Sequence, residues 1–289
     1  MKYSIVQNDG KKEVQHNSMP ERVMYACCPL CESANIGELT IGDCSKHPLY
    51  NPKINPKMHW KKCSDCLHVF TNGFFTEEIC EIVFGSSHKN QVVGNQIEQS
   101  RAVSARMIEK VLPFASEGIW LDVGFGNASL LFTAQEFGFR PVGIDLQKEN
   151  VHALRALNVE SHCVDLSELK LNEACSVISM ADVLEHMPFP KDGLVSANKL
   201  LVKGGVLLVS MPNTENIVWS SLTACNSNPY WGELEHYHNF SRTRLYQLLD
   251  EHGFKVMRYG ISERYRVCME VVAVKIREIH KDLVGSGKT

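Results

Sequence analysis

The segment I-W-L-D-V-G-F-G-N-A-S at residues 119–129 constrains the fold of this chain more than any other stretch. An apolar run leads into Asp122, then come Gly124 and Gly126, and a helix-like segment occupies residues 128–137. Glycines let the chain turn sharply and let a ligand approach the backbone, while the helix start offers free N–H groups. A second apolar run at 142–146 contains Asp145, about twenty residues further on, where nucleotide-binding sheets place an acid for ribose hydroxyls. The two segments predict an α/β sheet that holds a nucleotide-type ligand.

Strands and helices alternate from residue 119 onward, which is the pattern of a doubly wound parallel sheet. The expected strands lie near residues 119–123, 141–145, 160–164, 176–181, 205–210, 254–259 and 266–275. The expected helices lie near residues 128–137, 148–157, 191–200 and 243–252. Two further helices are expected before the sheet, one starting at Thr76 as an N-cap and an amphipathic one at 97–114.

Two C-x-x-C pairs near the N-terminus predict a metal site. The four cysteines have the spacing of two knuckles whose sulfurs converge on one zinc ion, and they are Cys28, Cys31, Cys63 and Cys66. A closed tetrahedron of thiolates leaves no open coordination position, so this zinc is expected to be structural. Cys44 and His47 lie between the pairs and are alternative ligands, and unligated cysteines in a small core are the remaining alternative.

The residues after position 119 resemble the class I S-adenosylmethionine (SAM) dependent methyltransferases. The resemblance rests on five motifs in the family's order: D-V-G-F-G-N-A at 122–128, G-I-D at 143–145, V-D-L at 164–166, D-V-L-E-H at 182–186, and G-G-V-L-L-V-S-M-P-N at 204–213. It covers roughly residues 99–275, with Ala128 where the family usually has a third glycine. The resemblance implies a Rossmann-like, seven-stranded α/β sheet with helices on both faces and an antiparallel last strand. The cysteine pairs add a small N-terminal zinc-ribbon module, a layout found in bacterial small-molecule methyltransferases.

The same resemblance implies which residues bind the cofactor. Asp122, Gly124 and Gly126 would hold the methionine part of SAM, and Asp145 would accept from both ribose hydroxyls. Asp165 would read the adenine edge together with the N–H of Leu166. Leu146 and Ala181 complete the implied cofactor set. Alternatively, Asp145 is an ordinary acid at a strand end, and Asp165 caps the turn that starts there.

Three histidines are candidates for chemistry on the methyl acceptor. His186 follows the fourth strand beside the expected methyl group, and its ordinary pKa suits a general base, although Glu185 and His186 could equally fix their loop. His236 and His238 lie in a segment that resembles the family's acceptor-binding insert, at about 213–241. At least one of the two is expected only to pack or to cap a helix. Together with Glu233 and Glu235 they could also hold a divalent metal.

The domain organisation follows from these segments. We expect a flexible leader at 1–22, the zinc-ribbon module at 23–75, a helical linker or lid at 76–116, the SAM-binding domain at 117–280 and a frayed tail at 281–289. The chain has 289 residues, a formal net charge of −3 and no apolar run of membrane-spanning length. The polar N-terminus and the eleven cysteines indicate a reducing, cytoplasmic setting.

Three functions are compatible with the sequence. The leading one is SAM-dependent methylation of a small molecule, at a hydroxyl or an acidic oxygen of a secondary metabolite, sugar or surface-polysaccharide precursor. A second is an RNA or protein methyltransferase whose ribbon holds a macromolecule, which the overall acidic charge disfavours. A third is a non-catalytic SAM-binding regulatory protein. The sequence leaves the acceptor and the oligomeric state open.

Overall fold

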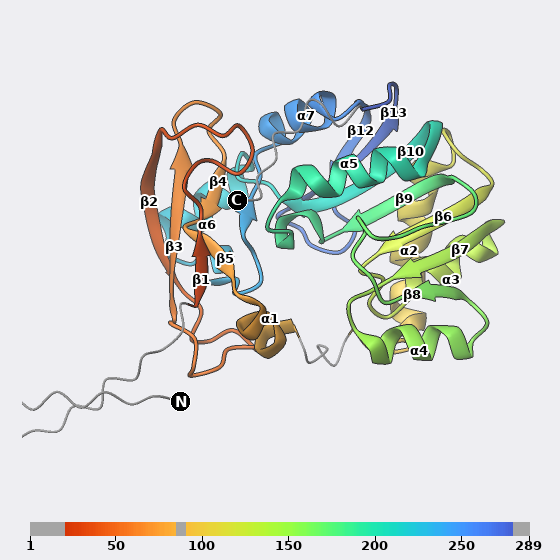
Figure 1. Ribbon diagram of the computed structural model, residues 1–289, viewed down its shortest axis with the longest axis horizontal. Coiled ribbons are helices and arrows are strands. Elements are labelled where there is room, and N and C mark those ends of the chain that lie inside the picture. The colour runs from red at the N-terminus through yellow and green to blue at the C-terminus, as the bar shows by residue number, and fades with distance from the viewer. Residues whose placement is uncertain (1–20, 85–90, 280–289) are drawn as a thin grey trace, which may run out of the picture.

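The computed structural model describes residues 21–84 and 91–279. The expected tail at 281–289, nearly all of the leader at 1–22, and residues 85–90 of the expected linker or lid lie outside the described residues. Figure 1 shows two parts joined side by side, with the N-terminal strands at the left and a large sheet flanked by helices at the right. No helix in the described ranges has the length and apolar character needed to cross a membrane.

The large part is built on a seven-stranded sheet in the order β12-β13-β10-β9-β6-β7-β8. Its strands are β6 (Gly118–Val123), β7 (Phe139–Ile144), β8 (Glu160–His162), β9 (Cys175–Ala181), β10 (Leu201–Pro212), β12 (Phe254–Ile261) and β13 (Cys268–Lys275). The pairs from β8 to β10 are parallel, and β13 runs antiparallel to both of its neighbours. The expected strand positions and the antiparallel last strand are therefore confirmed.

Helices cover both faces of this sheet because β6 alternates its side chains between two hydrophobic cores. Trp120 packs with one face of α2 (Ile97–Val111), α3 (Ser129–Glu136) and α4 (Lys148–Ala156). Ile119, Leu121 and Val123 pack on the opposite side with α5 (Pro190–Leu200) and α7 (Arg242–Glu251). The doubly wound arrangement predicted from the sequence follows from this alternation.

In the described ranges, the N-terminal part contains a two-stranded ribbon, a four-stranded sheet and one helix. The ribbon pairs β1 (Arg22–Met24) with β5 (Gly73–Phe75), and α1 (Glu77–Phe84) follows it. The four-stranded sheet has the order β11-β4-β3-β2, formed by β11 (His238–Asn239), β4 (Val69–Thr71), β3 (Lys57–Cys63) and β2 (Ile36–Asp43). The strand β11 belongs to the expected acceptor insert, so residues far apart in the sequence share one sheet.

The insert and the N-terminal part also share a core. Trp60 is fully buried and donates from Nε1 to the carbonyl oxygen of Trp231 at 2.9 Å. Leu234 and Tyr237 of the insert lie in the same buried cluster as Trp60 and Phe75. The ranges 23–75 and 213–241 therefore pack as one unit, although the sequence places them in separate domains.

The insert is more regular than its composition suggests. It contains α6 (Ile217–Ala224) and the 3-10 helix η3 (Pro229–Gly232). Asn216 and Asn228 each cap one of these helices, accepting from the N–H groups of Val218 and Tyr230. Both asparagines therefore serve as N-caps.

Candidate functional site

The turn after β6 has the backbone of a ligand-binding loop. Gly124, Gly126 and Ala128 all have positive φ values of 66°, 51° and 64°. The N–H of Gly124 donates to the carbonyl oxygen of Ile144 at 2.8 Å, which ties the turn to β7. A side chain at Gly124 would bring its Cβ to 3.1 Å from Val183 Cγ2. Glycine is needed there because the loop after β9 packs directly against the turn.

Asp122 is buried at the end of β6 and anchored to the neighbouring strand. Ser179 donates from Oγ to Asp122 Oδ1 at 2.6 Å, and Trp120 donates from Nε1 to Ser179 Oγ at 2.8 Å. Asp122 is only 2% exposed, and burial raises the pKa of its carboxyl to about 6. A buried acid with an unfavourable charge attracts a positively charged ligand.

Asp145 directly follows β7, and its carboxylate contacts both the turn after β6 and the turn that Asp145 itself begins. Its Oδ1 accepts from the N–H of Gln147 at 2.9 Å and its Oδ2 accepts from the N–H of Gly126 at 3.4 Å. Burial raises the pKa of this carboxyl as well. The structure therefore brings Asp122, Gly126 and Asp145 together at the carboxyl ends of two adjacent parallel strands, where open α/β sheets hold ligands.

The other expected cofactor residues differ in how far they are exposed to solvent. Asp165 is exposed, and its Oδ1 accepts from the N–H of Ser167 at 2.8 Å, which is the turn-capping geometry we had considered as the alternative. Leu166 is buried, and Leu146 is 71% exposed. Ala181 is buried at the end of β9, where its carbonyl oxygen accepts from Arg264 Nη1 at 3.3 Å. Their roles in cofactor binding stay predictions.

His186, in the loop after β9, faces His236 of the insert. The rings of His186 and His236 lie 4.7 Å apart in a T-shaped arrangement. His186 Nδ1 lies 3.0 Å from the carbonyl oxygen of Glu235. Because a carbonyl only accepts, Nδ1 is the donor of this hydrogen bond, which in a neutral ring places the lone pair at Nε2. A general base could use a lone pair in this position.

A buried carboxyl completes this group. Glu185 is 1% exposed, its Oε2 has no hydrogen-bond partner within the described part of the chain, and burial raises its pKa well above the ordinary value. His236 Nδ1 also has no partner among the residues that the structure describes, and burial lowers the pKa of this imidazole to about 3, so it is neutral. Ligand atoms of Glu185, His186 and His236 lie within 4.8 Å of one another. The group can receive a proton, hold a polar substrate atom or hold a cation.

His238 is placed differently from the other two. It is fully buried in β11, with Nε2 at 3.0 Å from the carbonyl oxygen of Met187 and Nδ1 at 3.0 Å from His68 Nε2. Burial lowers its pKa to about 4. Both nitrogens are occupied, so His238 joins β11 to the loop after β9 and to the N-terminal part. The sequence offered no signal for its partner His68, which lies 170 residues away.

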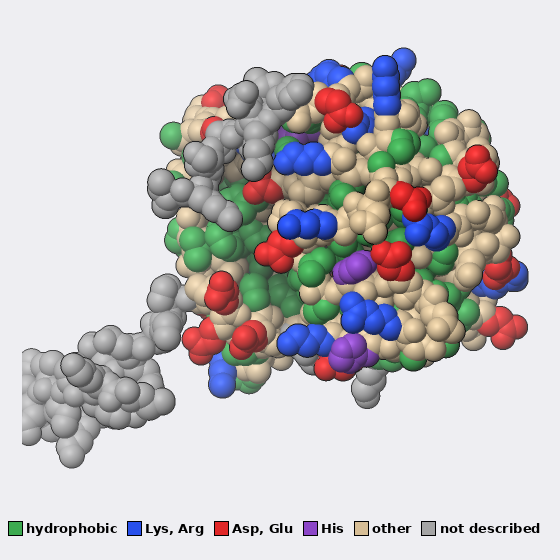
Figure 2. All heavy atoms as spheres, turned by 45° about the vertical axis from the view of Figure 1, so that its right-hand side comes forward, with side chains coloured by type: hydrophobic (Ala, Val, Ile, Leu, Met, Phe, Trp, Pro, Cys, Tyr) green, Lys and Arg blue, Asp and Glu red, His purple; other side chains and the backbone are tan. Residues whose placement is uncertain are grey.

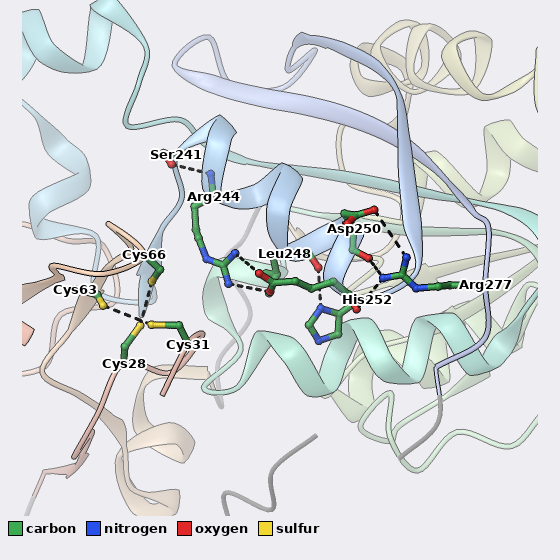
Figure 3. Close-up of polar contacts among 11 residues, drawn as sticks. Cys28, Cys31, Cys63, Cys66, Ser241, Arg244, Leu248, Asp250, His252 and Arg277 are labelled. Atoms are coloured by element: carbon green, nitrogen blue, oxygen red, sulfur yellow. Dashed lines mark hydrogen bonds and ion pairs between the residues drawn. The ribbon is translucent and has the colours of Figure 1, made fainter. Parts of the chain in front are cut away.

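The four predicted metal ligands converge in the N-terminal part (Figure 3). Ligand atoms of Cys28, Cys31, Cys63 and Cys66 lie within 4.8 Å of one another, with sulfur pairs 3.5 and 3.6 Å apart. All are free cysteines. A tetrahedral zinc ion with Zn–S bonds of about 2.3 Å holds its sulfurs roughly 3.8 Å apart, so this donor set fits zinc closely.

The alternative ligands lie elsewhere. Cys44 is buried with its sulfur 3.8 Å from the carbonyl oxygen of Asn55. His47 forms an ion pair with Glu233, and these two form a separate group with Glu235, whose ligand atoms also lie within 4.8 Å of one another. The interpretation of Cys44 or His47 as a ligand of the cysteine site is therefore wrong. The insert instead brings two acids to a histidine of the N-terminal part.

Comparisons with known proteins agree with this geometry. The methyltransferase domain family matches residues 97–259. A ubiquinone biosynthesis O-methyltransferase from Nitrosococcus oceani is 32% identical over 101 residues, which cover 32% of this chain and 43% of that protein. The chain thus spans less than half the length of this curated relative.

Solved structures resemble the chain at low identity. A chain in the complex between the Haloferax volcanii Trm112 methyltransferase activator and its methyltransferase has a TM-score of 0.50 and 15% identity, covering 64% of this chain and 95% of that one. The magnesium protoporphyrin IX methyltransferase of Synechocystis with bound SAH has a TM-score of 0.49 and 18% identity, covering 62% and 84%. At 15% identity, the likeness to the Haloferax volcanii chain speaks for the fold alone.

Proposed function

We propose that this chain, which belongs to the methyltransferase domain family, transfers the methyl group of SAM to a small molecule. The observation that carries the proposal is the meeting of Asp122, Gly126 and Asp145 at the carboxyl ends of β6 and β7. A buried acid suits the positive charge of SAM, and an acid beside a glycine turn suits its ribose.

The residues after β9 supply the acceptor chemistry in this proposal. SAM is already activated, so the protein needs only to align the acceptor with the methyl group and remove a proton. His186 accepts that proton at Nε2, because the carbonyl of Glu235 holds its Nδ1–H. His236 and Glu185 orient the acceptor through their unpartnered atoms.

We further propose that the acceptor atom is a hydroxyl oxygen. Glu185 is buried and Asp182 half-buried beside the histidines, and burial raises the pKa of each carboxyl. An anionic acceptor would lose its hydration in such a desolvated site, which argues against the acidic oxygen that the sequence allowed. Neutral hydroxyls of a secondary metabolite, sugar or polysaccharide precursor fit better.

The cysteine site binds structural zinc in this proposal. Cys28, Cys31, Cys63 and Cys66 would hold the ion, and the ion would stabilise the fold of the N-terminal part. The closed donor set leaves no position for a substrate.

A macromolecular substrate is less well supported. Contacts to RNA would come from the lysines near the second cysteine pair, with Trp60 stacking on a base. Trp60 is fully buried, and Lys61 lies near Glu38 at 3.9 Å. On the face shown in Figure 2, acidic and basic side chains are interspersed, whereas a nucleic-acid surface groups its basic residues.

The test is calorimetric titration with SAM and with NAD⁺, followed by methyl transfer from radiolabelled SAM to a panel of hydroxylated and amine small molecules. We expect binding of SAM only, and label in a hydroxylated product. Binding of NAD⁺ in place of SAM would refute the cofactor assignment. Binding of SAM without transfer to any acceptor would favour the regulatory alternative.

A further inference from the structure

Arg244 is a buried cation where the two parts of the molecule meet. It lies in the first turn of α7, where Ser241 Oγ accepts from its backbone N–H at 3.0 Å. Only 3% of its surface is exposed. Burying a guanidinium group is costly unless its charge is compensated and its donors are bonded.

One edge of the Arg244 guanidinium has its partner, and the other does not. Nη1 and Nη2 donate to the two carboxylate oxygens of Glu251 at 2.9 and 3.0 Å. The Nε–H is buried and has no acceptor among the described residues. Leaving a buried donor of a charged group unpaired is costly, so the Nε–H in this position calls for an acceptor.

The cysteine site lies on the side of this orphan donor. Figure 3 shows the Nε edge of Arg244 turned toward Cys66, with the other cysteines beyond. Arg244 and Cys66 line the same cavity of about 400 Å³, together with Lys62, which is exposed.

Zinc bound by four thiolates leaves roughly two negative charges in excess. Two of the four cysteines, Cys28 and Cys63, are fully buried, so water cannot screen this charge well. N–H groups around a metal site compensate the charge and tune the affinity of the ligands. The buried, unpartnered Nε–H of Arg244 has the charge and the placement for this task.

We propose that Arg244 is a positioning residue that compensates the charge of the zinc-loaded cysteine site through its Nε–H, and thereby couples metal binding to the docking of α7. Ser241 and Glu251, which hold Arg244, belong to the large part of the molecule, and the four cysteines belong to the N-terminal part. The zinc ion then stabilises the junction between the parts as well as the knuckles. This inference rests on the zinc site in the proposed function.

The test compares Arg244→Met with Arg242→Met in the full-length protein. Arg242 is a matched control, because it is an exposed arginine on the same helix that lies over the ring of Tyr259. Zinc affinity is measured by competition with a chromogenic chelator. We expect Arg244→Met to weaken zinc binding about 10- to 100-fold. Arg242→Met should stay within about twofold of the parent, as expected for an exposed charge.

A second variant keeps the test decisive if Arg244→Met fails to fold. Arg244→Lys keeps the charge but loses the Nε–H. After replacement of zinc by cobalt, its thiolate-to-cobalt charge-transfer band should shift relative to the parent. Equal zinc affinities for the two methionine variants, or an unshifted band for Arg244→Lys, would overturn the proposal. A parent protein that binds no zinc would instead overturn the metal site itself.

Discussion

Replacing Asp122 with asparagine should stabilise the ligand-free protein at pH 8. Burial raises the pKa of this carboxyl from 3.8 to about 6, at an exposure of 2%. A shift of this size corresponds to about 3 kcal/mol of unfavourable free energy for the ionised form in the folded state. Asparagine keeps an oxygen that accepts from Ser179 Oγ, while its new amide donors cost part of the gain if they lack acceptors. We expect a net gain of about 1–2 kcal/mol in the free energy of unfolding.

The sign of the pH dependence follows from linkage. The folded-state pKa of Asp122 lies above the unfolded value, so the folded protein binds this proton more tightly. The free energy of unfolding of the parent therefore falls as the pH rises from 3.8 to about 6. Below this window the carboxyl is protonated in both states and the penalty is absent, and above it the penalty is complete.

The assay is urea unfolding of the ligand-free parent and Asp122→Asn at several pH values from 5 to 8. The stability difference between them should grow with pH and level off near pH 7. Asp165→Asn, which changes an exposed acid, is the control and should follow the parent. A difference that is zero at pH 8, or the same at pH 5 and pH 8, would refute the reasoning. The stabilised variant should also bind SAM more weakly, because in the proposed function this charge faces the positively charged cofactor.

Three further predictions concern the site and the junction. Asp145→Asn should weaken SAM binding by about 1–3 kcal/mol, since one charged acceptor is lost; calorimetry with unchanged affinity would contradict the assignment. Cys63→Ser should release zinc and lower the thermal midpoint, which metal analysis and a melting curve would show together, whereas full zinc content would exclude Cys63 as a ligand. His186→Ala should lower turnover at saturating acceptor far more than it lowers SAM affinity. His238→Ala should reduce the stability of the protein with little change in the KM for the acceptor. The reverse pattern would exchange the roles of these two histidines.

The large sheet could be predicted from the sequence because its signals are local. Each strand is a short apolar run, and the turns after β6 and β7 carry the glycines and acids that such turns require. The pairing of Gly126 with Asp145 follows from two adjacent parallel strands ending at one edge. The convergence of the four cysteines was equally predictable, because knuckle spacing fixes their geometry.

The junction between the two parts could not be predicted in this way. The strand β11 is two residues long and has no periodicity, and its partner β4 precedes it by about 170 residues. The distinct roles of His236 and His238 also depend on this pairing, because it buries His238 against His68. That Arg244 Nε–H has no acceptor among the described residues likewise depends on tertiary packing, and no local sequence pattern predicts it.

The late arrival of β11 bears on how the cell makes this protein. The chain leaves the ribosome from its N-terminus, so all four cysteines emerge long before the strand that pairs with β4. About 170 residues separate the two strands. At a synthesis rate of about 5–20 residues per second, the edge of β4 therefore stays unpaired for roughly ten to thirty seconds. An unpaired strand edge invites association with other nascent chains. If the cysteines bind zinc as proposed, early capture of the ion would stabilise the incomplete sheet during this interval. The yield of active protein would then depend on the metal supply during translation.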